Sequence, residues 1–251
     1  MPLQVVILAG GLGTRMRPLT DTMPKSMVPV LGAPFAAWQL SWLATHGVKK
    51  VTFSIGHRGG MIRDHIGDGS PWGMSVDYVD EGEDLRGTAG ALRLVLDQGA
   101  LEESFFLLYG DSFLPVDMRA VKAAWQQARQ PALMTVMKNE NRWDVSNVIV
   151  AGDRVLLYDK SRPPDKVAEM HWIDYGLSIL TRDIIRDRVP SGVVADLADL
   201  LRDVSISGEL AALEVDRRFY EIGSAEGLGD LERYLMASGG GLAGSATPPP
   251  A

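Results

Sequence analysis

Glycines and cationic side chains occur together near the N-terminus of this 251-residue chain. The stretch Gly10-Gly11-Leu12-Gly13-Thr14-Arg15 follows an apolar segment, residues 3–8, that is typical of a buried strand. Glycine lets the backbone approach a ligand closely, and a loop at the carboxyl end of a strand presents N–H groups that bind phosphate. Arg17 and Lys25 add further positive charge, so we expect this loop to bind a polyphosphate.

The spacing of these residues separates this loop from two common phosphate loops. A P-loop requires Gly-Lys-Ser/Thr, but Lys25-Ser26 follows Pro24. A dinucleotide fingerprint requires a third glycine where Met16 stands, and Pro18 would interrupt the helix that the fingerprint opens. An ordinary glycine-rich turn between a strand and a helix explains the glycines but not the cations beside them.

Composition and charge limit the classes of function. The chain is 46% hydrophobic and 23% charged, which is typical of one large α/β domain or two small ones. It lacks an apolar run of the ~20 residues that a bilayer span needs, shows no secretory signal and contains no cysteine, so we expect a cytoplasmic protein without membrane contact. The net charge of −7 argues against nucleic-acid binding. Residues 1–30 nevertheless carry three cations against the single Asp21, which favours an anionic small-molecule ligand.

Predicted strands alternate with predicted helices along the chain, which indicates an α/β fold of parallel βαβ units. Two short segments around Gly152-Asp153 predict a hairpin. The predicted strands are residues 3–8, 51–55, 75–79, 105–108, 132–137, 147–150, 155–158, 173–180 and 213–221. The predicted helices are residues 35–43, 61–66, 88–96, 117–129, 196–204 and 227–236. Phe35, Trp38 and Trp42 recur at helical spacing, which indicates core packing.

The domain organisation follows from the absence of repeats and linkers. We expect one domain over residues 1–238, with one half at about 1–138 and a second half at about 139–238. The tail, residues 239–251, begins with three glycines, ends near three prolines and is predicted to be disordered.

The N-terminal motif resembles the signature of the sugar-1-phosphate nucleotidylyltransferases (NDP-sugar pyrophosphorylases). The resemblance extends from Leu8 to Val30 and includes Pro18-Leu19-Thr20 and Pro24-Lys25. It implies a Rossmann-like three-layer αβα sandwich with a mixed, mainly parallel sheet, similar to the glycosyltransferase-A fold. By resemblance, Arg15 contacts the triphosphate and Lys25 lies beside the reacting phosphates. The residues that would bind the nucleotide here are Leu8, Ala9, Gly10, Gly11, Gly13 and Thr14.

A second motif, Leu85-Arg86-Gly87-Thr88-Ala89-Gly90-Ala91, resembles the family's Leu-Gly-Thr-Ala-Gly-Ala segment, whose backbone meets the nucleobase. Gly87 would allow close approach, and Thr88 is placed to cap the helix that follows; the two roles are compatible. Family members carry glycine at or beside this position, so Arg86 is a departure from the family pattern. Glu81 is a candidate partner of the base or ribose.

Two carboxylates are candidate magnesium ligands. Asp111 ends an apolar strand in Tyr109-Gly110-Asp111-Ser112, and Mg²⁺ commonly binds one or two carboxylates together with phosphates and water. The resemblance implies that this aspartate is a metal ligand. The family's second ligand is the aspartate of an Asp-x-Gly-Thr/Ser segment, where this chain has Glu221-Ile222-Gly223-Ser224. We expect Glu221 to be the second ligand, although its side chain is one methylene longer.

The second half of the chain offers candidates for sugar-phosphate binding. Asp159-Lys160 resembles a Glu-Lys-Pro segment whose lysine binds the sugar phosphate, and Asp174 with Gly176 loosely resembles an Asn-x-Gly segment of the sugar pocket. Asp174 would accept hydrogen bonds from sugar hydroxyls; the alternative is a solvent-facing strand charge. Asn147 is a further sugar candidate. The four histidines share no ligand spacing and are interpreted as non-catalytic.

These motifs predict an enzyme that transfers a nucleotidyl group from an NTP to a sugar 1-phosphate, with Mg²⁺. A nucleotidyltransferase acting on phosphocholine or another non-sugar phosphate, and a non-catalytic nucleotide-binding regulator, are the alternatives. No acetyltransferase extension is expected after the last helix, so a bifunctional enzyme is disfavoured. Uracil, thymine, guanine and cytosine, the identity of the sugar and the oligomeric state are all left open.

Overall fold

The computed structural model describes residues 3–239, and its chain forms two compact units. The first contains Met1–Leu85, Leu108–Phe113 and Tyr220–Ala251; the second contains Arg86–Leu107 and Leu114–Phe219. Each unit therefore combines separate stretches of sequence, and neither coincides with the expected halves that meet near residue 138. The single-domain organisation stays a prediction, and the predicted disordered tail lies, apart from Gly239, outside the described residues.

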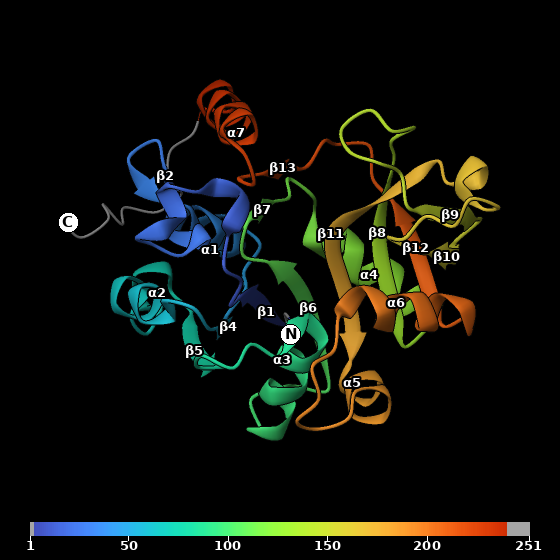
Figure 1. The fold of residues 1–251 in the computed structure, drawn as a ribbon, viewed down its shortest axis with the longest axis horizontal. Coiled ribbons are helices and arrows are strands. Elements are labelled where there is room, and N and C mark those ends of the chain that lie inside the picture. The colour runs from blue at the N-terminus through green and yellow to red at the C-terminus, as the bar shows by residue number, and fades with distance from the viewer. Residues whose placement is uncertain (1–2, 240–251) are drawn as a thin grey trace. The chain divides into compact units, whose positions relative to one another are not determined.

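The first unit contains three parallel strands in the order β5-β4-β1 (Figure 1). They are β1 (Gln4–Ala9), β4 (Lys50–Ile55) and β5 (Ser75–Asp80). β1 and β4 are buried almost throughout and mainly apolar, with Gln4, Thr52 and Ser54 as buried polar exceptions. Helices α1 (Phe35–Thr45) and α2 (Gly59–Ile66) follow β1 and β4 in the chain, together with the short 3₁₀ helices η1 (Thr14–Met16), η2 (Leu19–Asp21), η3 (Lys25–Met27) and η4 (Ser70–Trp72).

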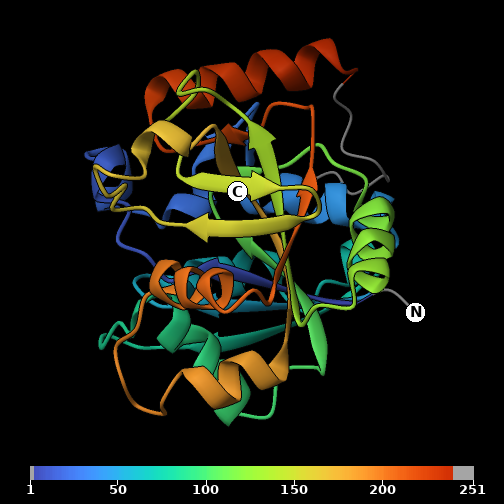
Figure 2. The same ribbon diagram turned by 90° about the vertical axis from the view of Figure 1, so that its right-hand side faces the viewer.

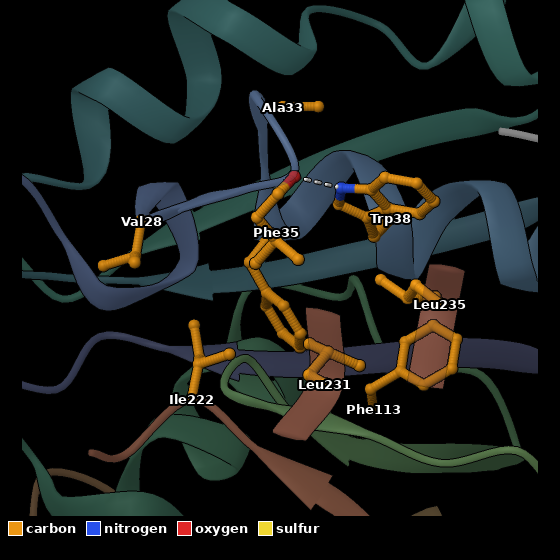
Figure 3. Close-up of a cluster of buried hydrophobic side chains, with 9 residues drawn as sticks. Val28, Ala33, Phe35, Trp38, Phe113, Ile222, Leu231 and Leu235 are labelled. Atoms are coloured by element: carbon orange, nitrogen blue, oxygen red, sulfur yellow. Dashed lines mark hydrogen bonds between the residues drawn. The ribbon is translucent and has the colours of Figure 1, made fainter. Parts of the chain in front are cut away.

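A hydrophobic cluster connects α1 with the C-terminal helix α7 (Ala225–Ala237) (Figure 3). Phe35 is completely buried in it, and the indole of Trp38 donates a 2.8 Å hydrogen bond to Val30 O, so the predicted core role of these aromatics is confirmed. Phe113 and Ile222 enter the same cluster. They belong to, or directly follow, two short antiparallel strands, β7 (Ser112–Phe113) and β13 (Tyr220–Glu221). A second short pair, β2 (Pro29–Val30) and β3 (Ala33–Pro34), precedes α1.

The second unit contains a mixed sheet in the order β11-β8-β12-β10-β9. Its strands are β8 (Ala132–Lys138), β9 (Val148–Ala151), β10 (Arg154–Tyr158), β11 (Trp172–Thr181) and β12 (Leu210–Glu214). β8 and β12 are parallel, whereas β9 and β10 form the predicted antiparallel hairpin (Figure 2). β6 (Ser104–Tyr109) begins in this unit, and its last two residues belong to the first. The helical segments are α3 (Gly87–Asp97), α4 (Met118–Ala128), α5 (Arg182–Arg188), α6 (Leu197–Ile206) and η5 (Val167–Glu169).

The predicted α/β class with a mixed sheet is confirmed, whereas one predicted strand is wrong. Residues 213–221 form two strands, because β12 ends at Glu214 and β13 begins only at Tyr220. Exposed Asp216 and Arg217 lie between them. Helix α5 was not predicted, since its seven residues are too few to show a clear helical period. In the described part of the chain, no helix has the length and apolar character that crossing a membrane requires.

Candidate functional site

The glycine loop follows β1 directly, and its glycines serve different purposes. Gly13 adopts a left-handed conformation with φ 63°, and the hydroxyl of Thr20 donates a 2.8 Å hydrogen bond to its carbonyl. Gly13 is therefore required by the fold itself. Gly11 lies outside the left-handed region, is exposed, and a Cβ added to it would meet no atom within 4 Å. Space for a ligand is therefore available at Gly11.

The remaining loop residues place polar groups beside this open backbone. Thr14 and Arg15 lie on η1 and are both exposed. Arg17 forms a 3.3 Å ion pair with Asp21 in which both side chains are more than half exposed. Such surface pairs contribute little stability, so this pair orders the loop only weakly.

Glu81 lies next to the glycine loop. It directly follows β5, just as Gly10 follows β1, so both residues lie at the carboxyl edge of the parallel strands. A Cβ on Gly10 would collide with the Oε1 atom of Glu81. The structure thus brings this candidate base or ribose partner to the loop, and the absence of a side chain at Gly10 makes the approach possible.

Lys25 and Asp111 meet in the first unit although 86 residues separate them. The Nζ atom of Lys25 lies 2.6 Å from Oδ2 of Asp111, with exposed side-chain fractions of 13% and 30%. The hydroxyl of Ser112 lies 3.2 Å from the other oxygen, Oδ1. A charge-assisted hydrogen bond of this length fixes the directions of both side chains.

The segment that contains Glu221 joins the same place through strand pairing. Glu221 is directly opposite Ser112 in the β7–β13 register, and Ile222 N donates a 3.0 Å hydrogen bond to Asp111 O. A Cβ on Gly223 would lie 3.2 Å from the Nζ atom of Lys25. The Glu221 backbone is therefore a neighbour of Asp111, and its side chain is exposed.

The donor set at Asp111 is compatible with Mg²⁺. Carboxylate oxygens are ligands that this ion prefers, and it typically takes only one or two of them from a protein. The ammonium group of Lys25 shows that a cation is accommodated at Asp111. Across residues 3–239, no cluster of three or more acidic or histidine side chains could hold a metal ion.

The second motif, around Gly87, is organised by contacts within the second unit. Gly87 has φ 69°, and a Cβ on it would lie 2.5 Å from Ala195 O. The same carbonyl accepts hydrogen bonds from the N–H groups of Ala89 and Gly90, at 2.9 and 3.1 Å. These glycines are therefore required where the loop before α6 packs on the first turn of α3. A contact between this motif and the nucleobase stays a prediction.

The prediction that Thr88 caps its own helix is wrong. Its hydroxyl accepts a 2.7 Å hydrogen bond from Leu197 N and lies 3.2 Å from Oδ1 of Asp196, the N-cap of α6, so it supports the start of α6 instead. In the first turn of α3, the N–H groups of Ala89 and Gly90 donate to Ala195 O instead. The Thr88 hydroxyl consequently serves a helix that begins more than 100 residues later.

Three of the four predicted sugar-phosphate residues are linked by hydrogen bonds in the second unit. Asp174 N donates to Oδ1 of Asn147 at 3.1 Å, and Gly176 N donates to Oδ1 of Asp174 at 2.9 Å. Burial raises the pKa of Asp174, an effect that the charge of Lys160 and hydrogen bonds from Gly176 and Tyr158 partly offset. Lys160 is thus electrostatically coupled to this group. The raised pKa disfavours the alternative of a solvent-facing strand charge.

Asp159 orders the loop that carries Lys160. Although burial acts to raise its pKa, hydrogen bonds from Ser161 and the guanidinium of Arg202 together lower it. Arg202 Nε lies 2.8 Å from Oδ2 of Asp159, and the Ser161 hydroxyl lies 2.6 Å from Oδ1. Asp159 therefore has a structural role, and its neighbour Lys160 is the candidate for binding the sugar phosphate. Sequence reasoning missed Arg202, which lies 43 residues away and in no recognisable motif.

Gly110 and Ser26 are two further residues of the first unit that sequence reasoning missed. A Cβ on Gly110 would lie 2.7 Å from the Ser26 hydroxyl and 3.0 Å from Leu8 O. The Ser26 hydroxyl donates a 2.6 Å hydrogen bond to Gly110 O. The sequence could have indicated both residues, because Gly110 directly precedes Asp111 and Ser26 directly follows Lys25.

Comparison with known proteins places this geometry in context. Residues 4–147 match a family model described as nucleotidyl transferase. The chain is similar to UTP–glucose-1-phosphate uridylyltransferase from Synechocystis sp., with 29% identity over 234 residues that cover 88% of this chain and 60% of that protein. It is 32% identical to N-acetylmuramate alpha-1-phosphate uridylyltransferase from Neisseria meningitidis serogroup B over 202 residues, which cover 80% of this chain and 84% of that protein. The chain thus spans less than two thirds of the length of the first relative.

A solved structure shares the fold. HddC from Yersinia pseudotuberculosis, complexed with GMP-PN, matches with a TM-score of 0.75 and 24% identity, over 92% of this chain and 99% of that one.

Proposed function

Because this chain belongs to the nucleotidyl transferase family, we propose that it transfers a nucleotidyl group from an NTP to a sugar 1-phosphate, giving an NDP-sugar and pyrophosphate. The observation that carries this proposal is the 2.6 Å pair of Lys25 and Asp111 in the same unit as the open glycine loop. Similarity to two sugar-1-phosphate uridylyltransferases supports it.

The glycine loop would bind the triphosphate. The backbone at Gly11 is open to solvent, and Thr14 and Arg15 are exposed on the turn that follows. N–H groups and a guanidinium are suitable donors for phosphate oxygens because their hydrogen bonds to an anion are charge-assisted. Leu8, Ala9, Gly10 and Gly13 would shape this loop, and Glu81 would contact the base or ribose.

Lys25 would act where the two anionic reactants meet. A phosphate oxygen of the sugar 1-phosphate attacks the α-phosphorus of the NTP, and pyrophosphate leaves. The attacking phosphate is already ionised near neutral pH, so no general base is required, and positioning and charge neutralisation supply most of the catalysis. The ammonium group of Lys25, held by Asp111, provides a fixed positive charge for this purpose.

Asp111 would bind Mg²⁺, with Glu221 as the second ligand. Bound there, Mg²⁺ would offset the negative charge of the triphosphate and of the leaving pyrophosphate. The strand pairing that joins Ile222 to Asp111 supports a role for the Glu221 segment.

Asn147, Lys160, Asp174 and Gly176 would bind the sugar 1-phosphate. The cationic Lys160 suits its phosphate, and the carboxylate of Asp174 suits hydroxyl donors. The hydrogen bonds that order Asn147, Asp174 and Gly176 support a shared role. A cytoplasmic location stays a prediction.

A pyrophosphate-release screen tests this function. UTP, dTTP, GTP and CTP are each combined with a set of sugar 1-phosphates and with phosphocholine, in the presence of Mg²⁺. We expect release with at least one sugar 1-phosphate and a large loss in the Lys25→Met variant. Release with phosphocholine alone would support the non-sugar alternative, and NTP binding without any release would support the regulator.

A further inference from the structure

We propose that Gln39 is a positioning residue for Asp111, through hydrogen bonds from its buried amide to the turn that carries this carboxylate. The inference rests on the proposed role of Asp111 in binding the metal. All of its contacts lie within the first unit.

The amide of Gln39 bridges the two sides of the Asp111 turn. Gln39 lies on α1 and is 2% exposed. Its Nε2 atom donates to Tyr109 O and to Ser112 O, both at 2.9 Å, although Tyr109 is 70 residues away in sequence. These two carbonyls flank Gly110 and Asp111, so one side chain fixes the start and the end of the turn.

The two carbonyls between them are also hydrogen-bonded. Gly110 O accepts from the Ser26 hydroxyl at 2.6 Å, and Asp111 O accepts from Ile222 N at 3.0 Å. Every carbonyl from residue 109 to residue 112 is therefore occupied. With the backbone held in this way, the Asp111 carboxylate is restricted to rotation about its own side-chain bonds.

The surroundings of Gln39 indicate that an amide is needed at this position for the two hydrogen bonds that its Nε2 atom donates. Its helical neighbours Trp38 and Leu40 are buried and apolar. Its Oε1 atom is buried and has no hydrogen-bond partner among residues 3–239, which costs free energy. Rotating the amide would not relieve this cost, because the oxygen would then face two carbonyl oxygens. The Gln39 side chain therefore donates two hydrogen bonds to the turn while its own Oε1 atom is left unsatisfied.

A matched pair of substitutions tests this role. Gln39→Met removes the donors and keeps the length of the side chain. Gln4→Met is the control, because Gln4 is 1% exposed and its Nε2 donates a 2.8 Å hydrogen bond to Thr52, at the end of β1 opposite the glycine loop. Binding of Mn²⁺ alone is measured by electron paramagnetic resonance, and Tm is measured in parallel.

Both variants should lower Tm, but only Gln39→Met should weaken Mn²⁺ binding, by about 10-fold or more, as is typical for residues that orient metal ligands. Ser26→Ala, which removes the bond to Gly110 O, should weaken Mn²⁺ binding in the same direction and serves if Gln39→Met fails to fold. Asp111→Asn should abolish the binding.

Two results would overturn the proposal. Loss of binding in Asp111→Asn, with Gln39→Met (or its substitute Ser26→Ala) within about twofold of wild type, would reject the positioning role while leaving Asp111 as a metal ligand. Unchanged binding in Asp111→Asn would reject the metal role of Asp111 and the inference with it.

Discussion

Replacing Gly11 by alanine separates the function of the glycine loop from its structural requirements. A Cβ at this position meets no atom within 4 Å, and Gly11 does not adopt a left-handed conformation. The fold should therefore tolerate the methyl group. A phosphate that approaches the same backbone should not, because the methyl group would occupy the space that glycine leaves open.

The expected magnitudes follow from these contacts. A Gly→Ala change at a compatible conformation typically stabilises a protein by about 0.4–1 kcal/mol, which corresponds to a rise in Tm of roughly 1–4 °C at this size. Losing one charge-assisted hydrogen bond to phosphate costs about 1.5–3 kcal/mol, so the Kd for NTP should rise roughly 10- to 150-fold.

Calorimetric titration with each of the four NTPs in the presence of Mg²⁺ measures the affinity, and a thermal melt measures Tm. Gly60→Ala is the matched control, since Gly60 is exposed on α2 and its Cβ would also meet no atom within 4 Å. NTP binding by Gly11→Ala at the strength of this control would refute the phosphate role of the loop. A clear fall in Tm would refute the structural reasoning.

The other predictions concern Lys25, Asp174 and Gly87. Lys25→Met should reduce kcat by roughly 10²–10³-fold, as is usual when a group that stabilises transition-state charge is removed, and unchanged turnover in the pyrophosphate assay would contradict its role. Burial raises the pKa of folded Asp174, so the wild type should lose stability as the pH rises from the unfolded pKa of ~3.9 through the folded value. Asp174→Asn should therefore raise Tm more at pH 7 than at pH 4, and a shift independent of pH would count against this reasoning. Gly87→Ala should destabilise by about 1–3 kcal/mol, because its Cβ would lie 2.5 Å from Ala195 O at φ 69°, and an unchanged Tm in a thermal melt would be inconsistent with that contact.

The sequence by itself determined the local features of this protein. Mainly apolar segments such as β1 and β4 identified buried parallel strands, because strands covered on both faces favour apolar side chains at most positions. The glycine loop was found because it directly follows β1, and Asp111 because it lies two residues after the end of β6. Their types and spacing also indicated the family, which the match over residues 4–147 confirms.

Only the tertiary structure decided which of these residues meet. The pairing of Lys25 with Asp111 spans 86 residues, and the amide of Gln39 reaches Tyr109 across 70 residues. The Thr88 hydroxyl accepts from the first N–H group of α6 instead of capping α3, whose Ala89 and Gly90 N–H groups donate to Ala195 O. Such contacts depend on where distant segments pack, and a periodic pattern of neighbouring residues carries no information about that.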